Sequence, residues 1–313
     1  MKYLQLFFML LLLVGCATMK QAHQLFDQGN YQAAITECRR AIEADSLNAE
    51  AYLILGKSHR ALGQYDLAVR NLNRAYHITS VSKITSQAKD ELAAIHLQLG
   101  DDALAEKNYH QALTEYRTTL ELDSTNYRAN FQLAVVYQQN HWLDKADYYF
   151  KKAASAGFDE QEVAARLAQI DSLTQLANEH FERGKQFYLR KRYVSAAREL
   201  ERATMLKQDH SDANYFYHIA TGKTLYRKGG KSNLWDAIEH FGKAMMIRFD
   251  SAEPHFFMAQ AYEKKDRNEF DNAISEYQLA LEKEPEGPLA NSCRKKIREL
   301  TGRRDKMKQF WGK

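Results

Sequence analysis

The feature that most constrains this chain is a pattern of two short helices that recurs along most of its length. Residues 49–82 contain two apolar stripes of helical period, and Gly63 lies between them. Leu55 and Gly56 belong to the first stripe, and Tyr65 begins the second. Apolar residues three and four positions apart indicate amphipathic helices, and a glycine between two such stripes indicates a tight turn. The stretch therefore predicts a helix–turn–helix unit.

The second helix of this unit recurs with small residues in two columns. The first column holds Ala34, Ala68, Ala112, Ala146, Ala196, Ala237 and Ala273. The second column holds Ala41, Ala75, Thr119, Ala153, Ala203, Ala244 and Ala280. Aligned on these columns, the chain divides into seven repeats at 15–48, 49–82, 93–126, 127–160, 177–210, 211–251 and 252–287. One such unit cannot bury its apolar face alone, so neighbouring units are expected to stack.

The pattern resembles the tetratricopeptide repeat (TPR), a helix–turn–helix unit of about 34 residues. The residues that carry the resemblance are Tyr52, Leu55, Gly56, Gly63, Tyr65, Ala68 and Ala75. The resemblance covers essentially all of residues 20–300 and implies an all-α fold, a right-handed superhelix (α-solenoid) with a concave groove. Two departures stand out. The opening helix of the first repeat lacks the expected signature, and the sixth and seventh repeats carry insertions around 227–234 and 266–269.

Two segments, 83–92 and 161–176, interrupt the repeat register but are helical in character. The second is expected to form an extra connecting helix between two sub-arrays of one continuous solenoid. The resulting organisation is 1–15 (signal peptide), 16–160 (repeats one to four), 161–176 (connecting helix), 177–287 (repeats five to seven) and 288–313 (basic capping helix and tail).

The N-terminus combines Lys2, an apolar run and the pair Gly15-Cys16. The run is shorter than the roughly 20 residues of a membrane span, and is typical of a secretion signal. Residues 13–16 are similar to the bacterial lipobox, which implies cleavage before Cys16 and attachment of lipid to its thiol. Ala17 then favours the outer membrane, facing the periplasm. The alternative is an ordinary signal peptide or short anchor with an incidental cysteine.

The other two cysteines, Cys38 and Cys293, lie far apart in a stacked array and cannot pair without large distortion. Both occupy apolar helix faces. We expect buried, unpaired thiols.

The resemblance to TPR places the fifth residue of each first helix in the groove. These candidate partner-binding residues are Leu53, Leu97, Phe131, Phe181, Tyr215 and Phe256, with Lys185 and Tyr188 beside them in the fifth repeat. A ladder of aromatic residues with polar neighbours suits an extended segment or an amphipathic helix of a partner protein. The same ladder also arises from the repeat consensus without any ligand. A TPR subclass that binds C-terminal carboxylates uses Lys and Asn at positions five and nine, a pair that none of these repeats has.

No catalytic, metal or cofactor site is expected. Residues 221–224 (TGKT) end like a phosphate-binding loop, but the first glycine of that motif is replaced by Tyr217. The histidines show no metal-ligand spacing, and His59, His96 and His218 fall at helix contacts.

The chain has a net charge of +4, but residues 288–313 hold nine lysines and arginines against Glu299 and Asp305. The positive balance is therefore a property of this C-terminal segment. Its apolar stripe is Ala290, Cys293, Ile297 and Leu300, which suits a helix that caps the array. The basic face allows three interpretations: a solvated cap, contact with anionic lipid or cell-wall material near Phe310 and Trp311, and nucleic-acid binding, which an extracytoplasmic location disfavours.

The sequence thus predicts a non-enzymatic scaffold or adaptor, anchored by lipid to a bacterial envelope membrane, that assists assembly of an envelope complex through its groove. The alternative is an accessory lipoprotein that binds glycan or peptidoglycan, in which groove aromatics would stack on sugars.

Overall fold

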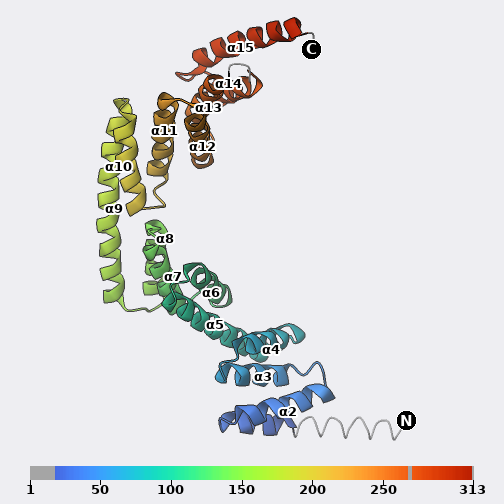
Figure 1. Ribbon diagram of the computed structural model, residues 1–313. Coiled ribbons are helices and arrows are strands. Elements are labelled where there is room, and N and C mark those ends of the chain that lie inside the picture. The colour runs from blue at the N-terminus through green and yellow to red at the C-terminus, as the bar shows by residue number, and fades with distance from the viewer. Residues whose placement is uncertain (1–17, 267–269, 312–313) are drawn as a thin grey trace. The chain divides into compact units, whose positions relative to one another are not determined.

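The computed structural model describes residues 18–266 and 270–311, and within these ranges the chain is helical with short turns and no strand (Figure 1). The all-α prediction is confirmed. Residues 1–17, which include the predicted signal and Cys16, lie outside the described residues. After a helical stretch at 18–27, the helices are α2 (Tyr31–Ala44), α3 (Ala49–Ala61), α4 (Tyr65–Ile78), α5 (Ser82–Ala105), α6 (Tyr109–Leu122), α7 (Tyr127–Gln139), α8 (Leu143–Ser155), α9 (Glu160–Leu189), α10 (Tyr193–Leu206), α11 (Ser211–Lys228), α12 (Lys231–Ile247), α13 (Ala252–Lys265), α14 (Phe270–Lys283) and α15 (Ala290–Trp311).

The contacts divide the chain into two units. Unit 1 comprises Met1–Tyr137 and Lys145–Arg166, and unit 2 comprises Gln138–Asp144 and Leu167–Lys313. Each unit is a stack of helix hairpins with its own apolar core. In unit 1 the largest fully buried side chains include Ile35, Leu72 and Tyr116, and in unit 2 they include Leu200 and Phe241.

In four of the repeats the two helices cross closely because the first helix carries a glycine at the contact. A Cβ atom added to Gly56 would lie 2.6 Å from Cγ of Leu72. The same distance of 2.6 Å separates such an atom from a side-chain carbon of the partner helix at Gly100, Gly184 and Gly222. Real Cβ atoms do not approach so closely, so these positions require glycine. This recurring contact supports the prediction of one repeated hairpin.

In each of the first five repeats, the turn between the two helices has one residue in the left-handed conformation. Gly63 has φ 70°, as its place between the stripes predicted. The equivalent residues of the third, fourth and fifth repeats are not glycine, although they share this conformation: Lys107 (φ 59°), His141 (φ 56°) and Lys191 (φ 57°). The backbone geometry of the turn is therefore kept where the glycine is not.

Asparagine caps α3 and α7, the helices that follow two of the turns between repeats. The side chain of Asn48 accepts a hydrogen bond of 2.9 Å from the backbone N–H of Ala51. Asn126 accepts one of 3.0 Å from Ala129. The preceding Asp45 accepts instead from Leu47, at 3.0 Å, and so holds the turn. The cap therefore lies two residues beyond the serine that follows the aspartate.

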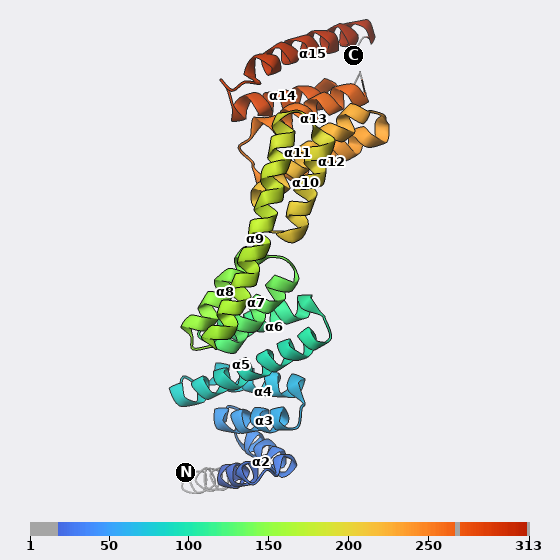
Figure 2. The ribbon, with the colours of Figure 1, turned by 90° about the vertical axis from the view of Figure 1, so that its left-hand side faces the viewer.

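The segments 83–92 and 161–176 are not separate helices. The first lies within α5 and the second forms the first half of α9, which Figure 2 shows as one unbroken helix. The extra connecting helix expected at 161–176 is therefore wrong as a separate element. Apolar spacing continues from Val163 through Ile170 to Ala177, all of them buried, and no proline interrupts it.

Helix α15 closes the stack of unit 2, beside α14 (Figures 1 and 2). Ala290, Cys293 and Leu300 are buried, and the last two pack in one cluster with Tyr277. The predicted capping helix is confirmed. Cys38 and Cys293 are free, buried thiols as expected, and burial raises the pKa of Cys38 to about 12.

Candidate functional site

The surface formed by the first helices of unit 1 holds two adjoining hollows, of about 350 and 340 Å³, that both border Phe26 and Lys57. Helical residues 18–27, α3 and α5 supply most of the walls. The Arg60 hollow is lined by Phe26, Lys57, Arg60, Ala61, Tyr65, Glu91, Ala94 and Gln98. The Leu53 hollow is lined by His23, Phe26, Asp27, Glu50, Leu53, Ile54, Lys57, Val81, Lys83, Ile84 and Gln87.

Three charged side chains meet at the floor of the Arg60 hollow. The guanidinium of Arg60 pairs with one oxygen of Glu91, and Nζ of Lys57 lies 3.8 Å from the other. Two cations thus share one carboxylate, and no other acid lines this hollow. The Arg60 hollow therefore carries one positive charge that its own lining does not neutralise, which favours an acidic group in a ligand.

Lys57 is held at the boundary of the two hollows. Its Nζ lies 5.9 Å above the ring of Phe26, a cation–π distance. Its side chain keeps 21% of its exposure, so a ligand can reach the ammonium. At the rim of the Leu53 hollow, Nε2 of His23 lies 2.8 Å from Oε1 of Glu50.

A closed version of the same arrangement lies in unit 2. Lys223 follows Gly222 as Lys57 follows Gly56, and its Nζ lies 2.6 Å from Oε1 of Glu253 and 2.6 Å from the hydroxyl of Tyr188. The side chain of Lys223 is only 5% exposed. Burial lowers the pKa of Lys223 although Glu253 opposes the shift, and burial raises the pKa of Tyr188. The ammonium group of Lys223 in unit 2 is thus buried and paired within the protein, whereas that of Lys57 in unit 1 stays accessible to a ligand.

Most of the predicted groove residues are packed between helices. Leu97 and Lys185 are half-buried. The other six are buried: Leu53, Phe131, Phe181, Tyr188, Tyr215 and Phe256. Of the eight, only Leu53 lines one of the two hollows described above. That these residues bind a partner stays a prediction.

Three of the predicted aromatics meet in unit 2 around Phe216, which the sequence did not single out. The ring centroid of Phe216 lies 6.1 Å from Phe181, 5.2 Å from Tyr188 and 5.3 Å from Tyr215. In unit 1, Phe131 stacks on Phe158 at 4.0 Å. These aromatic rings pack against one another, which leaves little ring surface for stacking on a ligand.

The register predicted for the sixth repeat is one helical turn early. The residue that closely approaches Phe241 of the second helix is Gly222, four positions after His218, where a count from Ser211 places the glycine of the repeat. Ile219 therefore occupies the position assigned to Tyr215. The shift also places Lys223 in line with Lys57, a correspondence that the sequence count concealed.

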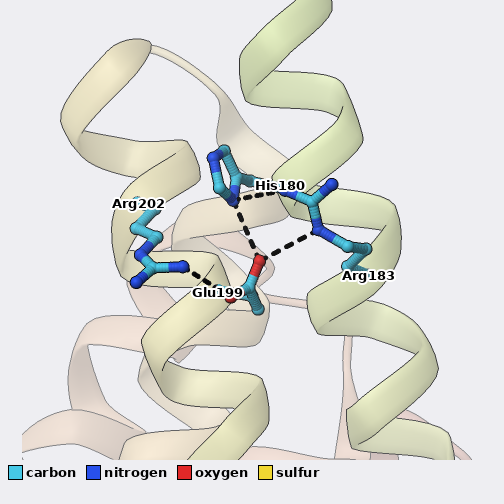
Figure 3. A network of polar contacts seen from close by, with 4 residues as sticks. All are labelled: His180, Arg183, Glu199 and Arg202. Atoms are coloured by element: carbon cyan, nitrogen blue, oxygen red, sulfur yellow. Dashed lines mark hydrogen bonds and ion pairs between the residues drawn. The ribbon is translucent and has the colours of Figure 1, made fainter.

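Histidine–glutamate pairs join the two helices of several repeats. Nδ1 of His180 lies 2.9 Å from Oε2 of Glu199, which also accepts from Arg183, while Arg202 pairs with the other oxygen (Figure 3). Burial would raise the pKa of Glu199, but the hydrogen bonds from His180 and Arg183 lower it overall. Equivalent pairs are His96–Glu115 and His255–Glu276, both at 2.7 Å. These histidines pack and pair, and in 18–266 and 270–311 no group of three or more His, Cys, Asp or Glu side chains could hold a metal ion.

Residues 221–224 do not form a phosphate-binding loop, because they lie inside α11 with Gly222 and Lys223 buried. Among the described helices, none is both long enough and apolar enough to cross a bilayer.

Comparison with known proteins identifies the repeat. The sequence profile of the tetratricopeptide repeat matches residues 19–82, the region that also forms much of both hollows. Residues 19–82 carry the tetratricopeptide repeat. It is 28% identical over 113 residues to "Protein bimA" of Emericella nidulans, covering 36% of this chain and 13% of that protein. It is 23% identical over 239 residues to "Anaphase-promoting complex subunit 3" of Schizosaccharomyces pombe, covering 68% of this chain and 33% of that protein.

The chain therefore spans no more than about one third of the length of these curated relatives. Among solved structures, a tetratricopeptide repeat protein from Parabacteroides merdae is 13% identical, covering 92% of this chain and 99% of that one, with a TM-score of 0.36.

The site includes residues that the sequence analysis passed over: Phe26, Arg60, Lys83, Glu91 and Gln98. Phe26 was missed because the opening helix of the first repeat lacks the repeat signature. Lys83 and Glu91 fall in the segment 83–92, which looked like an insertion outside the repeats. A signal was present, since Ile84, Ala88 and Leu92 recur at helical spacing and so mark that segment as the start of the next helix.

Proposed function

We propose that this chain is a non-enzymatic adaptor that binds an extended segment of a partner protein in the two hollows of unit 1. The observation that carries the proposal is the accessible group of Lys57, Arg60 and Glu91 beside the apolar wall of Phe26 and Leu53. Its counterpart at Lys223 in unit 2 is sealed.

The shape and chemistry of the hollows favour an extended segment with two kinds of side chain. The hollows adjoin at Phe26 and Lys57, so one continuous segment can enter both. The Leu53 hollow offers apolar contact from Phe26, Val81 and Ile84, and the Arg60 hollow carries surplus positive charge. We expect an apolar residue and a nearby acidic residue in the bound segment, which alternate pockets would recognise.

We further propose that the chain is anchored to a bacterial envelope membrane, the outer membrane facing the periplasm, through lipid on Cys16. The support is the similarity of residues 13–16 to the lipobox. The anchor is tested by metabolic labelling with a fatty acid and by membrane fractionation of a Cys16→Ser variant. Loss of label and release from the membrane are expected, and a Cys16→Ser protein that keeps its label would refute the anchor.

An adaptor in the assembly of an envelope complex fits a membrane-anchored array with an open binding surface. The Schizosaccharomyces pombe relative is named as a subunit of a complex, which accords with a role in assembly. No specific observation favours binding of glycan or peptidoglycan, because the aromatic rings that would stack on sugars are buried.

The adaptor function is tested by filling the Arg60 hollow. Ala94→Arg adds bulk to its wall in α5 without removing any contact, and partner capture from the native host is then compared with wild type. The matched control, Ala105→Arg, makes the same change at an exposed site of α5 that lines neither hollow. Clients lost with Ala94→Arg and retained with Ala105→Arg are expected. Clients that persist in both variants would contradict the proposal.

A further inference from the structure

We propose that the C-terminal end of α15 binds the surface of an anionic phospholipid membrane, with Phe310 and Trp311 in the interface and neighbouring lysines on the headgroup phosphates. This site is separate from the hollows of unit 1, and it does not depend on the lipid at Cys16.

Helix α15 presents two chemically different sides. One side is buried on the rest of unit 2 through Ala290, Cys293 and Leu300. The described helix otherwise carries eight lysines and arginines against only Glu299 and Asp305. The cap of the array therefore needs one side of the helix, and the basic side remains for another role.

Part of this basic charge is neutralised within the protein. Lys296 pairs with Glu263 at 2.8 Å, and Arg304 with Asp271 at 2.9 Å. Lys295 lies 3.9 Å from Glu299 in the same helix. These contacts belong to the cap and explain its basic residues only in part.

Three further cations of α15 are exposed and have no acidic partner among the described residues: Arg298, Lys306 and Lys308. Two of them lie in the last two turns of the helix. An ammonium group without an internal partner is free to neutralise an external phosphate, and a surface with several such groups attracts anionic lipid.

An exposed aromatic pair adjoins the two lysines. Phe310 is 81% and Trp311 is 69% exposed, and their rings form an edge-to-face pair with centroids 5.3 Å apart. Lys306 lies four residues before Phe310 and Lys308 three residues before Trp311, so each lysine shares a helix face with one ring. Exposure of two large aromatic rings to water is unfavourable. At a membrane interface, the rings match the apolar layer and the lysine ammonium groups match the layer of headgroup phosphates.

At such an interface the rings replace water with the acyl boundary, while the lysine stems run along the apolar layer and place their charges among the phosphates. A nucleic acid or an acidic protein would use the lysines, but neither would need the rings to leave water for a hydrocarbon layer. The combination therefore points to a membrane surface.

The test uses Trp311 as its own probe. In the full chain, Trp142→Phe and Trp235→Phe leave Trp311 as the only tryptophan. Its fluorescence is recorded with vesicles of phosphatidylcholine and with vesicles that also contain phosphatidylglycerol. We expect a blue shift, and quenching by lipids brominated on the acyl chain, only with the anionic vesicles. The readout reports α15 itself, so membrane attachment through the N-terminus does not mimic it.

Charge removal is tested in the same background with Lys306→Gln/Lys308→Gln. Each lysine near an anionic surface is worth roughly 1 kcal/mol, so the vesicle concentration for half-maximal shift should rise about 30-fold. The matched control is Lys228→Gln/Lys231→Gln, which removes two exposed lysines from the facing ends of α11 and α12. The control should behave as the parent protein.

A second measurement avoids the tryptophan replacements. Flotation of the otherwise unaltered chain with anionic vesicles is compared with Phe310→Ser/Trp311→Ser. The variant should float less at every salt concentration, because the rings supply the part of binding that salt does not screen. An unshifted Trp311 emission with anionic vesicles, or a shift that the lysine replacements leave unchanged, would overturn the proposal.

Discussion

The ammonium group of Lys223 lies 2.6 Å from Oε1 of Glu253 and is buried under the ring of Phe257, whose centroid is 4.0 Å away. Tyr188 completes the contact from a third helix. Side chains from α9, α11 and α13 thus meet at one buried charge, which ties the fifth, sixth and seventh repeats together.

The two partners of this ion pair should differ in what their loss costs. Glu253→Leu leaves the buried ammonium without its carboxylate, and we expect a loss of about 2–3 kcal/mol, below the full value for a buried pair because Glu253 is 30% exposed. Lys223→Met removes the buried charge and keeps its volume, so we expect a loss of less than about 1 kcal/mol. Urea unfolding followed by circular dichroism measures both. Equal losses would show that the charge is not the cause.

Replacing glycine by alanine should destabilise the protein where two helices cross closely, and should stabilise it at a helical position that contacts no other helix. Gly184→Ala places a Cβ atom 2.6 Å from Cγ of Leu200, and we expect a loss of about 1–3 kcal/mol from overpacking. Gly302→Ala, in α15, meets nothing within 4 Å, and should stabilise unit 2 by about 0.5–1 kcal/mol. Thermal unfolding of the two variants should shift in opposite directions. A shift in the same direction would refute the contact.

The paired histidines of the sixth repeat should make stability depend on pH. Nδ1 of His218 lies 2.9 Å from Nδ1 of His240, and burial lowers the pKa of His218 from 6.5 to about 4, with His240 and Lys243 adding to the shift and Glu239 opposing it. Between these pH values the unfolded chain binds more protons, so stability falls as the pH falls. We expect a loss of about 1–2 kcal/mol over this window, since both rings are only half-buried.

His240→Glu recreates the pairing seen at His180 and Glu199, and should reverse this dependence. His218 would then gain an acidic partner and a raised pKa, so its contribution would be full at low pH and lost as the pH rises through that pKa. Urea unfolding at pH 5 and pH 7 compares the variant with wild type. An unchanged difference between the two pH values would mean that the pair does not titrate as described.

Much of the fold could be predicted because each repeat has small residues at characteristic spacings in the sequence. The spacing of Gly56, Ala68 and Ala75 specified the hairpin and its close crossing, and Gly63 specified the turn. Position in the array was harder to predict. The insertion in the sixth repeat was placed around 227–234, after Gly222, and this placement hid the role of Gly222, because helical period alone does not reveal which turn of a helix meets its partner.

The candidate site was predicted less well, for a physical reason. A large apolar residue at the fifth position of a first helix can face a ligand or a neighbouring repeat, and Phe131, Phe181 and Phe256 were found buried. Whether a repeat offers a binding surface depends instead on whether its lysine is buried, as Lys223 is, or accessible to a ligand, as Lys57 is. That difference arises from contacts between distant segments, which no local pattern records.

The most direct test of the adaptor function is site-specific photo-crosslinking in the native host. A photo-reactive amino acid replaces Gln98, which lines the Arg60 hollow, or Asn73 of α4, which is exposed and lines neither hollow. The account predicts defined protein adducts from position 98 that disappear with Ala94→Arg and persist with Ala105→Arg, and no such adducts from position 73. Adducts of equal pattern from both positions, or none from position 98, would contradict it.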